Sequence, residues 1–429
     1  MNASALGKPG ALFTAFRTYN ARMAHPGENA PYVVALDGQA LAGDRPTGLG
    51  RVARALHRAL LDLPGLQVVP LMPPRLEGFR SAPERLLWEQ VQLPSRMADS
   101  GAGLLHCPAF GCPALGRFPK VLTVHDLLPR TGHYETGQSR GALWYWARYL
   151  PGTAVHASAI ITNSRETKLQ LCREVPVDPT CVFPIPLGAP WEAGAPVDPV
   201  AAQRWREERP VPEPYLLMVG SLVPRKQPAT LLLALAELRD RGIRLPLVVV
   251  GEGEPYGGQL RGLAKGVGVA NQVHWLGFVG DDGLLHAIYA SALAVVCPSG
   301  GEGFDLPSVE ACCAGVPVVA STLPVHREVL GDAARYFPTG DPHALADQLA
   351  ALLDPGAWES AAAGALACGA RYSWRHHAAG AAALYRALID RQPLPTPDAL
   401  TAWVRDGAAG DPPRGMSAPP RAPWIVGSA

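Results

Sequence analysis

Two glutamates in one glycine-rich stretch are the side chains of this sequence best suited to bind a polar ligand. The stretch, residues 299–321, reads SGGEGFDLPSVEACCAGVPVVAS and places Glu302 and Glu310 with seven residues between them. The apolar run at 293–297 precedes it and predicts a buried strand. Asp305 is followed two residues later by a proline, so we expect Asp305 to be the N-cap of a helix that carries Glu310.

The ligand that fits this arrangement has one anionic group between two diols. A helix that begins after a glycine loop offers free N–H groups and the positive end of its dipole to a phosphate. A carboxylate on each side can accept hydrogen bonds from neighbouring sugar hydroxyls. This combination describes a nucleoside diphosphate sugar. The alternative is that Glu310 is a solvated helix residue and Glu302 a loop charge, and the spacing with the glycines and the proline argues against it.

A second glycine-rich turn lies near the start of the chain. Gly48 and Gly50 stand between a predicted strand at 32–37 and a predicted amphipathic helix at 52–63, and Arg51 adjoins them. A strand, a glycine turn and a helix bring backbone N–H groups close to an anion, and the arginine adds a charge. The alternative interpretation is an ordinary tight turn.

A histidine and a pair of cations follow two other predicted strands. His125 comes directly after the strand at 121–124, and ligands of doubly wound sheets bind outside the carboxyl ends of the strands. Arg225 and Lys226 follow the strand at 215–220, and adjacent cations at such a turn suit a diphosphate leaving group. The alternatives are a surface or core histidine and two solvated loop charges.

The glutamate stretch resembles the E-x7-E signature of the retaining glycosyltransferases of family GT4. The resemblance implies that Glu302 lies against the donor hexose and that Glu310 binds the nucleotide ribose, with Gly303 and Phe304 as further donor-binding residues. Asp305 is a departure, because the family often has glycine there. A carboxylate would repel the pyrophosphate unless it turned away to cap the helix, which is the conformation we expect.

Other segments extend this resemblance over most of the chain, from about residue 32 to 388. The segment TVHDLLP is similar to the family segment whose histidine faces the transferred sugar, which makes His125 a catalytic candidate beside Glu302. The cation pair resembles that of polysaccharide mannosyltransferases. The resemblance implies donor-binding roles for Gly48, Gly50, Arg51, Arg225 and Lys226.

Composition agrees with a large globular protein. A chain of 429 residues favours two domains, and its 48% hydrophobic and 17% charged residues are typical of large buried sheets. The formal net charge of +1 gives no reason to expect nucleic-acid binding. The eight cysteines are scattered and no histidine cluster completes a metal site, which predicts a reduced, cytoplasmic protein without a bound metal.

The resemblance implies an α/β protein with the GT-B fold, in which two doubly wound Rossmann-like domains face each other across a cleft and a C-terminal helix crosses back. The predicted parts are a disordered extension at 1–31, an acceptor-side domain at 32–190, a linker at 191–213, a donor-binding domain at 214–371, the crossover helix at 372–390 and a disordered tail at 391–429.

The implied function is transfer of a hexose, with retention of configuration, from a nucleoside diphosphate sugar to a glycan or lipid-linked glycan. The setting is cell-surface polysaccharide biosynthesis. GDP-mannose is the favoured donor, and neither a metal nor a cofactor is expected. Two alternatives remain open. One is a catalytically silent GT-B subunit that binds a nucleotide or a partner enzyme, and the other is a phosphorylase or epimerase on the same fold.

The aromatic and basic segment at 143–149 also has two interpretations. It forms either a helix partly buried on the first sheet or a contact with a lipid-linked acceptor or the membrane surface. The second interpretation would add a peripheral contact at the inner face of the membrane to a cytoplasmic protein.

Overall fold

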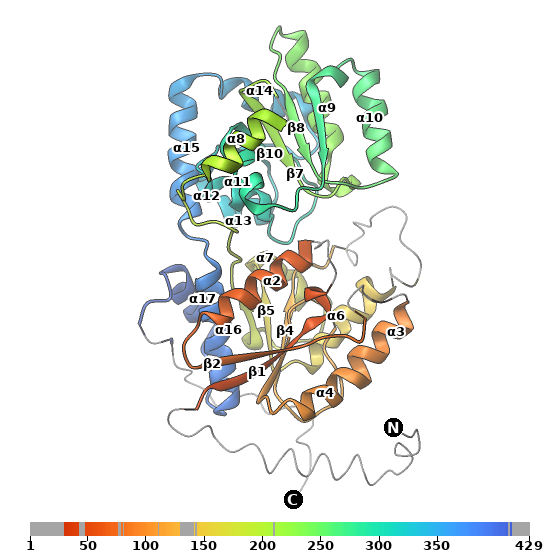
Figure 1. Ribbon diagram of the computed structural model, residues 1–429, viewed down its shortest axis with the longest axis vertical. Coiled ribbons are helices and arrows are strands. Elements are labelled where there is room, and N and C mark those ends of the chain that lie inside the picture. Colours follow the sequence, from red (N-terminus) through yellow and green to blue (C-terminus); the bar gives the residue numbers. More distant parts are fainter. Residues whose placement is uncertain are drawn as a thin grey trace, which may run out of the picture.

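The computed structural model describes residues 30–42, 48–75, 79, 81–109, 111–128, 141, 144–208, 211–410 and 412–413. These residues form two α/β lobes, which lie one above the other in Figure 1. Apart from its last two residues, the predicted N-terminal extension lies outside the described residues.

The first lobe is built on a sheet of six parallel strands in the order β2-β1-β3-β4-β5-β6. Neighbouring residues of β1 alternate between two apolar clusters, since Val34 and Leu36 pack on one face and Ala35 on the other. Both faces of the sheet are therefore covered, as is usual for parallel sheets. The strands are β1 (Tyr32–Asp37), β2 (Leu66–Leu71), β3 (Leu104–Cys107), β4 (Lys120–Val124), β5 (Ala159–Thr162) and β6 (Val182–Pro184).

Helices connect these strands and cover the sheet. They are η1 (Gly38–Leu41), α2 (Gly48–Leu61), α3 (Ala82–Leu87), η2 (Trp88–Gln92), α4 (Leu93–Asp99), η3 (Tyr145–Tyr149), α6 (Leu150–Gly152), η4 (Thr153–His156), α7 (Arg165–Glu174) and η5 (Pro179–Cys181).

The second lobe contains another sheet of six parallel strands, in the order β12-β11-β10-β7-β8-β9. Strands β10 and β7 are neighbours, and the chain proceeds outward from them in opposite directions, so the crevice at their carboxyl ends is a topological switch point. The strands are β7 (Tyr215–Val219), β8 (Leu247–Val250), β9 (Val273–Gly277), β10 (Ala292–Cys297), β11 (Val318–Ser321) and β12 (Ala334–Phe337).

The helices of the second lobe are η6 (Pro224–Lys226), α9 (Pro228–Asp240), α10 (Tyr256–Gly266), η7 (Ala270–Gln272), α11 (Asp282–Ala290), α12 (Leu306–Cys313), α13 (Pro324–Leu330), η8 (Gly331–Ala333), α14 (Pro342–Ala351) and α15 (Pro355–Gly369). The two sheets and their parallel order confirm the predicted α/β fold of two Rossmann-like units.

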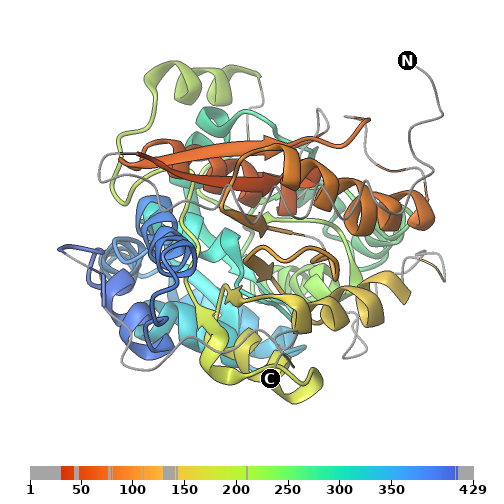
Figure 2. The same cartoon turned by 90° about the horizontal axis from the view of Figure 1, so that it is seen from below.

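The end of the chain returns to the first lobe, as Figures 1 and 2 show for the blue helices. Helix α16 (Trp374–Ile389) packs on α2, β1 and β3. Helix α17 (Pro397–Arg405) follows it and packs on α16 and β6. The prediction of disorder from 391 onward is therefore wrong for α17, whose Leu400 and Val404 enter the core of the first lobe.

The predicted linker at 191–213 also contains a helix, α8 (Pro199–Glu208). Its Trp205 is buried edge-on against Tyr215 at 5.9 Å between ring centroids, and the helix packs on α11. This part of the predicted linker is thus attached to the second lobe.

The described side chains of the aromatic segment at 143–149 differ in burial, which agrees with the predicted partly buried helix and leaves a contact with a lipid or membrane as a prediction. Tyr145 is only 2% exposed, whereas Trp144 is 50% exposed and stacks on Tyr149. Across the parts of the chain that the structure describes, no helix combines the length and the apolar character needed to cross a bilayer.

Candidate active site

The glycine loop follows β10 at the switch point of the second sheet, and α12 begins directly after it. Asp305 stands at the junction with a left-handed backbone, φ +71°. Its carboxylate faces Lys226 and His326 at 3.4 Å each, instead of capping α12. Asp305 thus stands at the predicted N-cap position of α12, but its side chain makes no capping hydrogen bond because it points to these two basic groups instead.

Glu302 is buried among the predicted phosphate-binding cations. Its Oε1 lies 2.6 Å from Lys226 Nζ and accepts a 2.6 Å hydrogen bond from Ser299, while its Oε2 lies 3.2 Å from Arg225. Burial alone would lower the pKa of Lys226, but the Glu302 and Asp305 carboxylates outweigh it and raise that pKa above its ordinary value. The structure thus brings a fully charged lysine and Glu302 together.

Glu310 occupies a separate position on α12. The hydroxyl of Tyr289 donates a 2.6 Å hydrogen bond to its Oε2, and Arg51 of the first lobe lies 3.8 Å from its Oε1. Arg51 also pairs with Asp282 at 2.9 Å. Burial raises the pKa of Glu310, and the charge of Arg51 opposes that shift. Arg51 thus reaches from α2 to the carboxylate that was expected to bind a ribose.

The predicted glycine turn of the first lobe forms part of a helix. Gly48 and Gly50 both lie in the first turn of α2, which starts at Gly48, four residues before the predicted start. The residues just before this helix, 43–47, lie outside the described residues. Arg51 is placed on the cleft side by this first turn.

His125 and the glycine loop are in contact across the two lobes. A β-carbon added to Gly303 would lie 2.0 Å from the His125 carbonyl oxygen, so this close approach requires glycine. Ser164 and Thr167, at the start of α7, have hydroxyl oxygens 2.7 and 3.2 Å from the Gly303 carbonyl oxygen.

The His125 ring is held in one orientation. Its Nε2 lies 2.7 Å from the Pro108 carbonyl oxygen, which can only accept, so Nε2 carries the proton. Burial lowers the pKa of His125, which favours the neutral ring with a lone pair on Nδ1. Phe304, by contrast, turns into the core of the second lobe against Tyr372, leaving only its backbone for a ligand.

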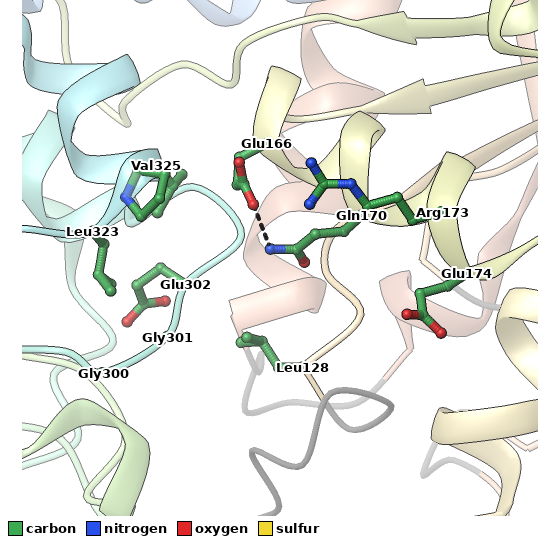
Figure 3. Close-up of a pocket in the computed structure, with 11 residues that line it drawn as sticks. Leu128, Glu166, Gln170, Arg173, Glu174, Gly300, Gly301, Glu302, Leu323 and Val325 are labelled. Carbon is green, nitrogen blue, oxygen red and sulfur yellow. Dashed lines mark hydrogen bonds between the residues drawn. The ribbon is translucent and has the colours of Figure 1, made fainter.

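A pocket of about 280 Å³ opens beside Glu302, between the lobes. Figure 3 shows one wall from α7, with Glu166, Gln170 and Arg173, and an opposite wall from the glycine loop and Val325. Gln170 donates a 2.9 Å hydrogen bond to Glu166. The mixed apolar and polar lining of this pocket can hold a polyol next to Glu302.

Sequence reasoning missed four residues of this site. Asp126 lies next to His125, and burial raises its pKa against the opposing charge of Arg225. Its position directly after β4 was a usable signal. Ser299, Tyr289 and His326 carry no local signal, because their roles depend on which carboxylate the fold places beside them.

Comparison with known families covers both lobes. The model of the family described as Glycosyltransferase Family 4 matches residues 41–190, and that of Glycosyl transferases group 1 matches residues 200–363. The chain belongs to the GT4-type glycosyltransferases.

Among curated relatives, this GT4-type chain is 31% identical over 265 residues to the MMP alpha-(1->4)-mannosyltransferase of Mycolicibacterium hassiacum, covering 59% of this chain and 60% of that protein. It is 34% identical over 164 residues to the O-antigen chain mannosyltransferase B of Escherichia coli, covering 38% of this chain and 43% of that protein. The matched region thus spans less than two thirds of either relative.

Solved structures show the same GT-B fold. Sucrose-phosphate synthase from Thermosynechococcus elongatus has a TM-score of 0.66 at 21% identity, and Anabaena HepE in complex with UDP and glucose has 0.62 at 18%. Each comparison covers 83% of this chain and 99% of the other. At these identities the likeness concerns the fold alone.

Proposed function

We propose that this chain transfers a hexose from a nucleoside diphosphate sugar to a glycan or lipid-linked glycan, with retention of configuration. One observation carries the proposal. Groups of both lobes meet around the glycine loop and α12, since Glu302 pairs with Lys226, Arg51 of the first lobe lies 3.8 Å from Glu310, and the His125 backbone carbonyl packs against Gly303. Two carboxylates, two cations and a neutral imidazole suit a donor of this class.

The diphosphate would bind at Lys226, Arg225 and the first turn of α12. Fixed positive partners stabilise the charge that grows on a leaving group, because they need no rearrangement during the reaction. Glu302 pairs with both cations, so an incoming diphosphate competes with that carboxylate. Glu310 would accept hydrogen bonds from the ribose hydroxyls while Arg51 remains beside the same carboxylate.

Glu302 and His125 would hold the hexose. The lone pair on His125 Nδ1 can accept a hydrogen bond from a sugar hydroxyl, as can Glu302. The acceptor oxygen would form its bond to the anomeric carbon on the face from which the diphosphate leaves. The carbon–phosphate oxygen bond breaks, and the acceptor proton passes to the leaving phosphate. No cofactor other than the donor takes part in this scheme.

The donor we favour is GDP-mannose, with support from two relatives named as mannosyltransferases. The HepE complex with UDP and glucose supports a nucleotide-sugar donor in general. We assign the pocket beside Glu302 to the acceptor. The half-exposed Trp144 beside Arg148 is the surface we assign to a peripheral contact with the inner face of the membrane.

Thermal stability against UDP, GDP, ADP and TDP sugars tests the donor. A ligand that binds only the folded state stabilises it by about 2.7 kcal/mol at roughly a hundred times its dissociation constant. The expected result is a rise in Tm with one base, followed by release of that nucleoside diphosphate only when a glycan acceptor is added. If none of the four changes Tm, the donor site is wrong and a silent subunit becomes the better interpretation.

A further inference from the structure

A buried row of charged groups lies behind the glycine loop. Lys226 Nζ is 3.4 Å from Asp305 Oδ1, and His326 Nε2 is 3.4 Å from Asp305 Oδ2. The side chains of Asp305 and His326 are 1% and 0% exposed, so solvent does not screen these contacts. The donor role expected for Lys226 makes this row part of the phosphate site.

The hydrogen bonds of His326 indicate that its ring carries two protons. Its Nδ1 lies 2.9 Å from the Ser321 carbonyl oxygen, which can only accept. The Ser321 hydroxyl donates to the Ser299 carbonyl at 2.6 Å, and so it too can only accept from Nδ1. A neutral ring would then turn a bare Nε2 lone pair toward the Asp305 carboxylate. The imidazolium form removes this conflict.

The electrostatic surroundings agree with that assignment. Burial alone would lower the pKa of His326, but the neighbouring Asp305 carboxylate outweighs it and raises that pKa. Burial alone would raise the pKa of Asp305, but Lys226 and His326 hold it well below its ordinary value. The other groups that act on this pair are Glu302 of the loop and Cys297 of β10.

The backbone conformation of Asp305 also indicates that its side-chain contacts stabilise the loop. Its φ of +71° lies in the left-handed region, which glycine adopts readily and aspartate only occasionally, as a single residue. The contacts with Lys226 and His326 stabilise that conformation.

We propose that Asp305 and His326 are positioning residues, which hold Lys226 at the phosphate site and make donor affinity depend on pH. The inference rests on the proposed donor site. Asp305 and Glu302 hold Lys226 Nζ from two sides. Protonated His326 pairs with Asp305, which also pairs with Lys226, and so it adds one positive charge to the proposed phosphate site. Donor affinity therefore falls as the pH rises through the pKa of His326.

Calorimetric binding of GDP-mannose and UDP-glucose between pH 5.5 and 9 measures this effect, because the diphosphate of a nucleotide sugar keeps its charge over that range. We expect the affinity of the unaltered protein for the donor it binds to fall about tenfold, a usual size for coupling between two sites. His326→Gln should remove this fall, and Asp305→Asn should move it to lower pH. His343→Gln, at a largely exposed histidine of α14, should leave it unchanged.

Loss of affinity without a change in the pH profile would mean that the pair is only structural, and would overturn the inference. If Asp305→Asn does not fold, Asp305→Gly replaces it, since glycine suits the backbone there. Titration of the His326 ring by NMR, assigned with His326→Gln, needs no ligand. Its pKa should fall when Asp305 is replaced, and an unchanged pKa would contradict the inference. If neither donor binds at any pH, the proposed donor site fails, and the ring titration still decides whether Asp305 controls His326.

Discussion

Glu302 and Glu310 are both buried carboxylates of one short segment, but they have opposite surroundings. Glu302 lies between two cations, whereas Glu310 is bonded to a neutral hydroxyl and has Arg51 at a longer distance. A ligand hydroxyl at Glu310 therefore meets one cation at a longer distance, whereas removal of Glu302 takes away a carboxylate that pairs with two cations. The two glutamates should respond differently to the same substitution.

Glu310→Ala should weaken binding of the nucleoside diphosphate about 10- to 100-fold, because a hydrogen bond to a charged group contributes about 1.5–3 kcal/mol. Glu302→Ala should leave that binding intact or tighten it, since Lys226 and Arg225 remain and a carboxylate that competes for them is gone, and it should lower turnover. Calorimetry and a transfer assay measure the two effects. Glu359→Ala, at an exposed glutamate of α15, is the control. Equal nucleotide affinity with and without Glu310 would remove the ribose assignment.

At the residue scale, sequence was informative where a role depends on local spacing. Glu302, Glu310 and Lys226 follow strand ends, and the fold brings parallel strand ends to one edge. The N-cap position of Asp305 was predicted, but the direction of its side chain was not, because N-cap preference is a local rule. Its partner Lys226 is 79 positions away, and no local pattern reports a buried cation supplied by another loop.

Among the elements, α7 is held by groups from the opposite lobe. The two carboxylate oxygens of Glu328, on α13, accept hydrogen bonds from the backbone N–H groups of Arg165 and Glu166 at 2.7 and 3.0 Å. Ser164, the N-cap of α7, lies against the Gly303 carbonyl. The first turn of α7 therefore joins the lobes on either side of the donor loop.

Glu328→Gln should lower turnover about fivefold, because an anion at a helix N-terminus contributes up to about 1 kcal/mol. Nucleotide affinity should hardly change, since the expected nucleotide ligands Glu310 and Lys226 lie outside this contact. Steady-state kinetics with saturating donor, together with nucleotide calorimetry, separates the two quantities. Asp332→Asn, at an exposed carboxylate of η8, serves as a matched control. A parallel loss of nucleotide affinity would refute a role confined to joining the lobes.

Helices η2 and η3 meet through a second buried carboxylate network. Glu89 accepts a hydrogen bond from Tyr145, and Gln39 bonds both Glu89 and Asp37. Burial raises the pKa of Glu89 to about 7 and that of Asp37 to about 6. Both groups keep a proton in the folded state at a pH where the unfolded chain has lost it.

Stability should therefore decrease as the pH rises from about 4.5, the ordinary value for Glu89, to about 7. For Glu89 the shift corresponds to about 3 kcal/mol, at 1.36 kcal/mol per pKa unit. Glu89→Gln should flatten this pH dependence. Compared with the unaltered protein, the variant should therefore gain more stability at pH 8 than at pH 5. Unfolding by urea at several pH values measures it, with Glu359→Gln as the control. An unchanged slope in the Glu89 variant would show that this carboxyl ionises freely in the fold.

Helices α17 and α8 were missed because the segments around them are rich in proline and glycine. Helix α17 has a Thr396 cap, Pro397 in its first turn and apolar residues at Leu400 and Val404, four positions apart. These are good local signals, but the surrounding proline and glycine suggested a disordered tail. In α8 likewise, Ala201 and Trp205 form a short apolar stripe. A short helix that packs on an already folded domain can be stabilised by the apolar contacts of a single turn.

For the whole molecule, the two parallel sheets were predictable, because each strand is a short apolar run followed by a turn and a helix. The contacts between the lobes were not. The Arg51–Glu310 and Ser164–Gly303 contacts require the relative placement of two units that are built on separate sheets. Sequence periodicity describes each unit and says nothing about the angle between them.

Removal of residues 373–429 should prevent stable folding of the first lobe. Helices α16 and α17 supply Ala381, Leu384, Tyr385 and Leu400 to the same core as Leu36 of β1. Their loss would expose that apolar face. We expect the shortened chain to bind an apolar dye and to lose the cooperative unfolding of the first lobe, measured by calorimetry. Removal of residues 414–429 alone is the control and should leave both transitions in place.

The return of α16 to the first sheet has a consequence for synthesis on the ribosome. Strand β6 ends at Pro184, and the whole second lobe is translated before Trp374 emerges. During that interval the face of the first sheet that α2 shares with α16 and α17 is only partly covered, and its exposed apolar residues are a potential binding site for a chaperone. The second lobe, complete once α15 has packed on α12, can fold in the meantime. Domains of nascent chains generally fold from the N-terminus onward. In this protein the first lobe is translated first, but its folding is completed last, once α16 and α17 have been synthesised.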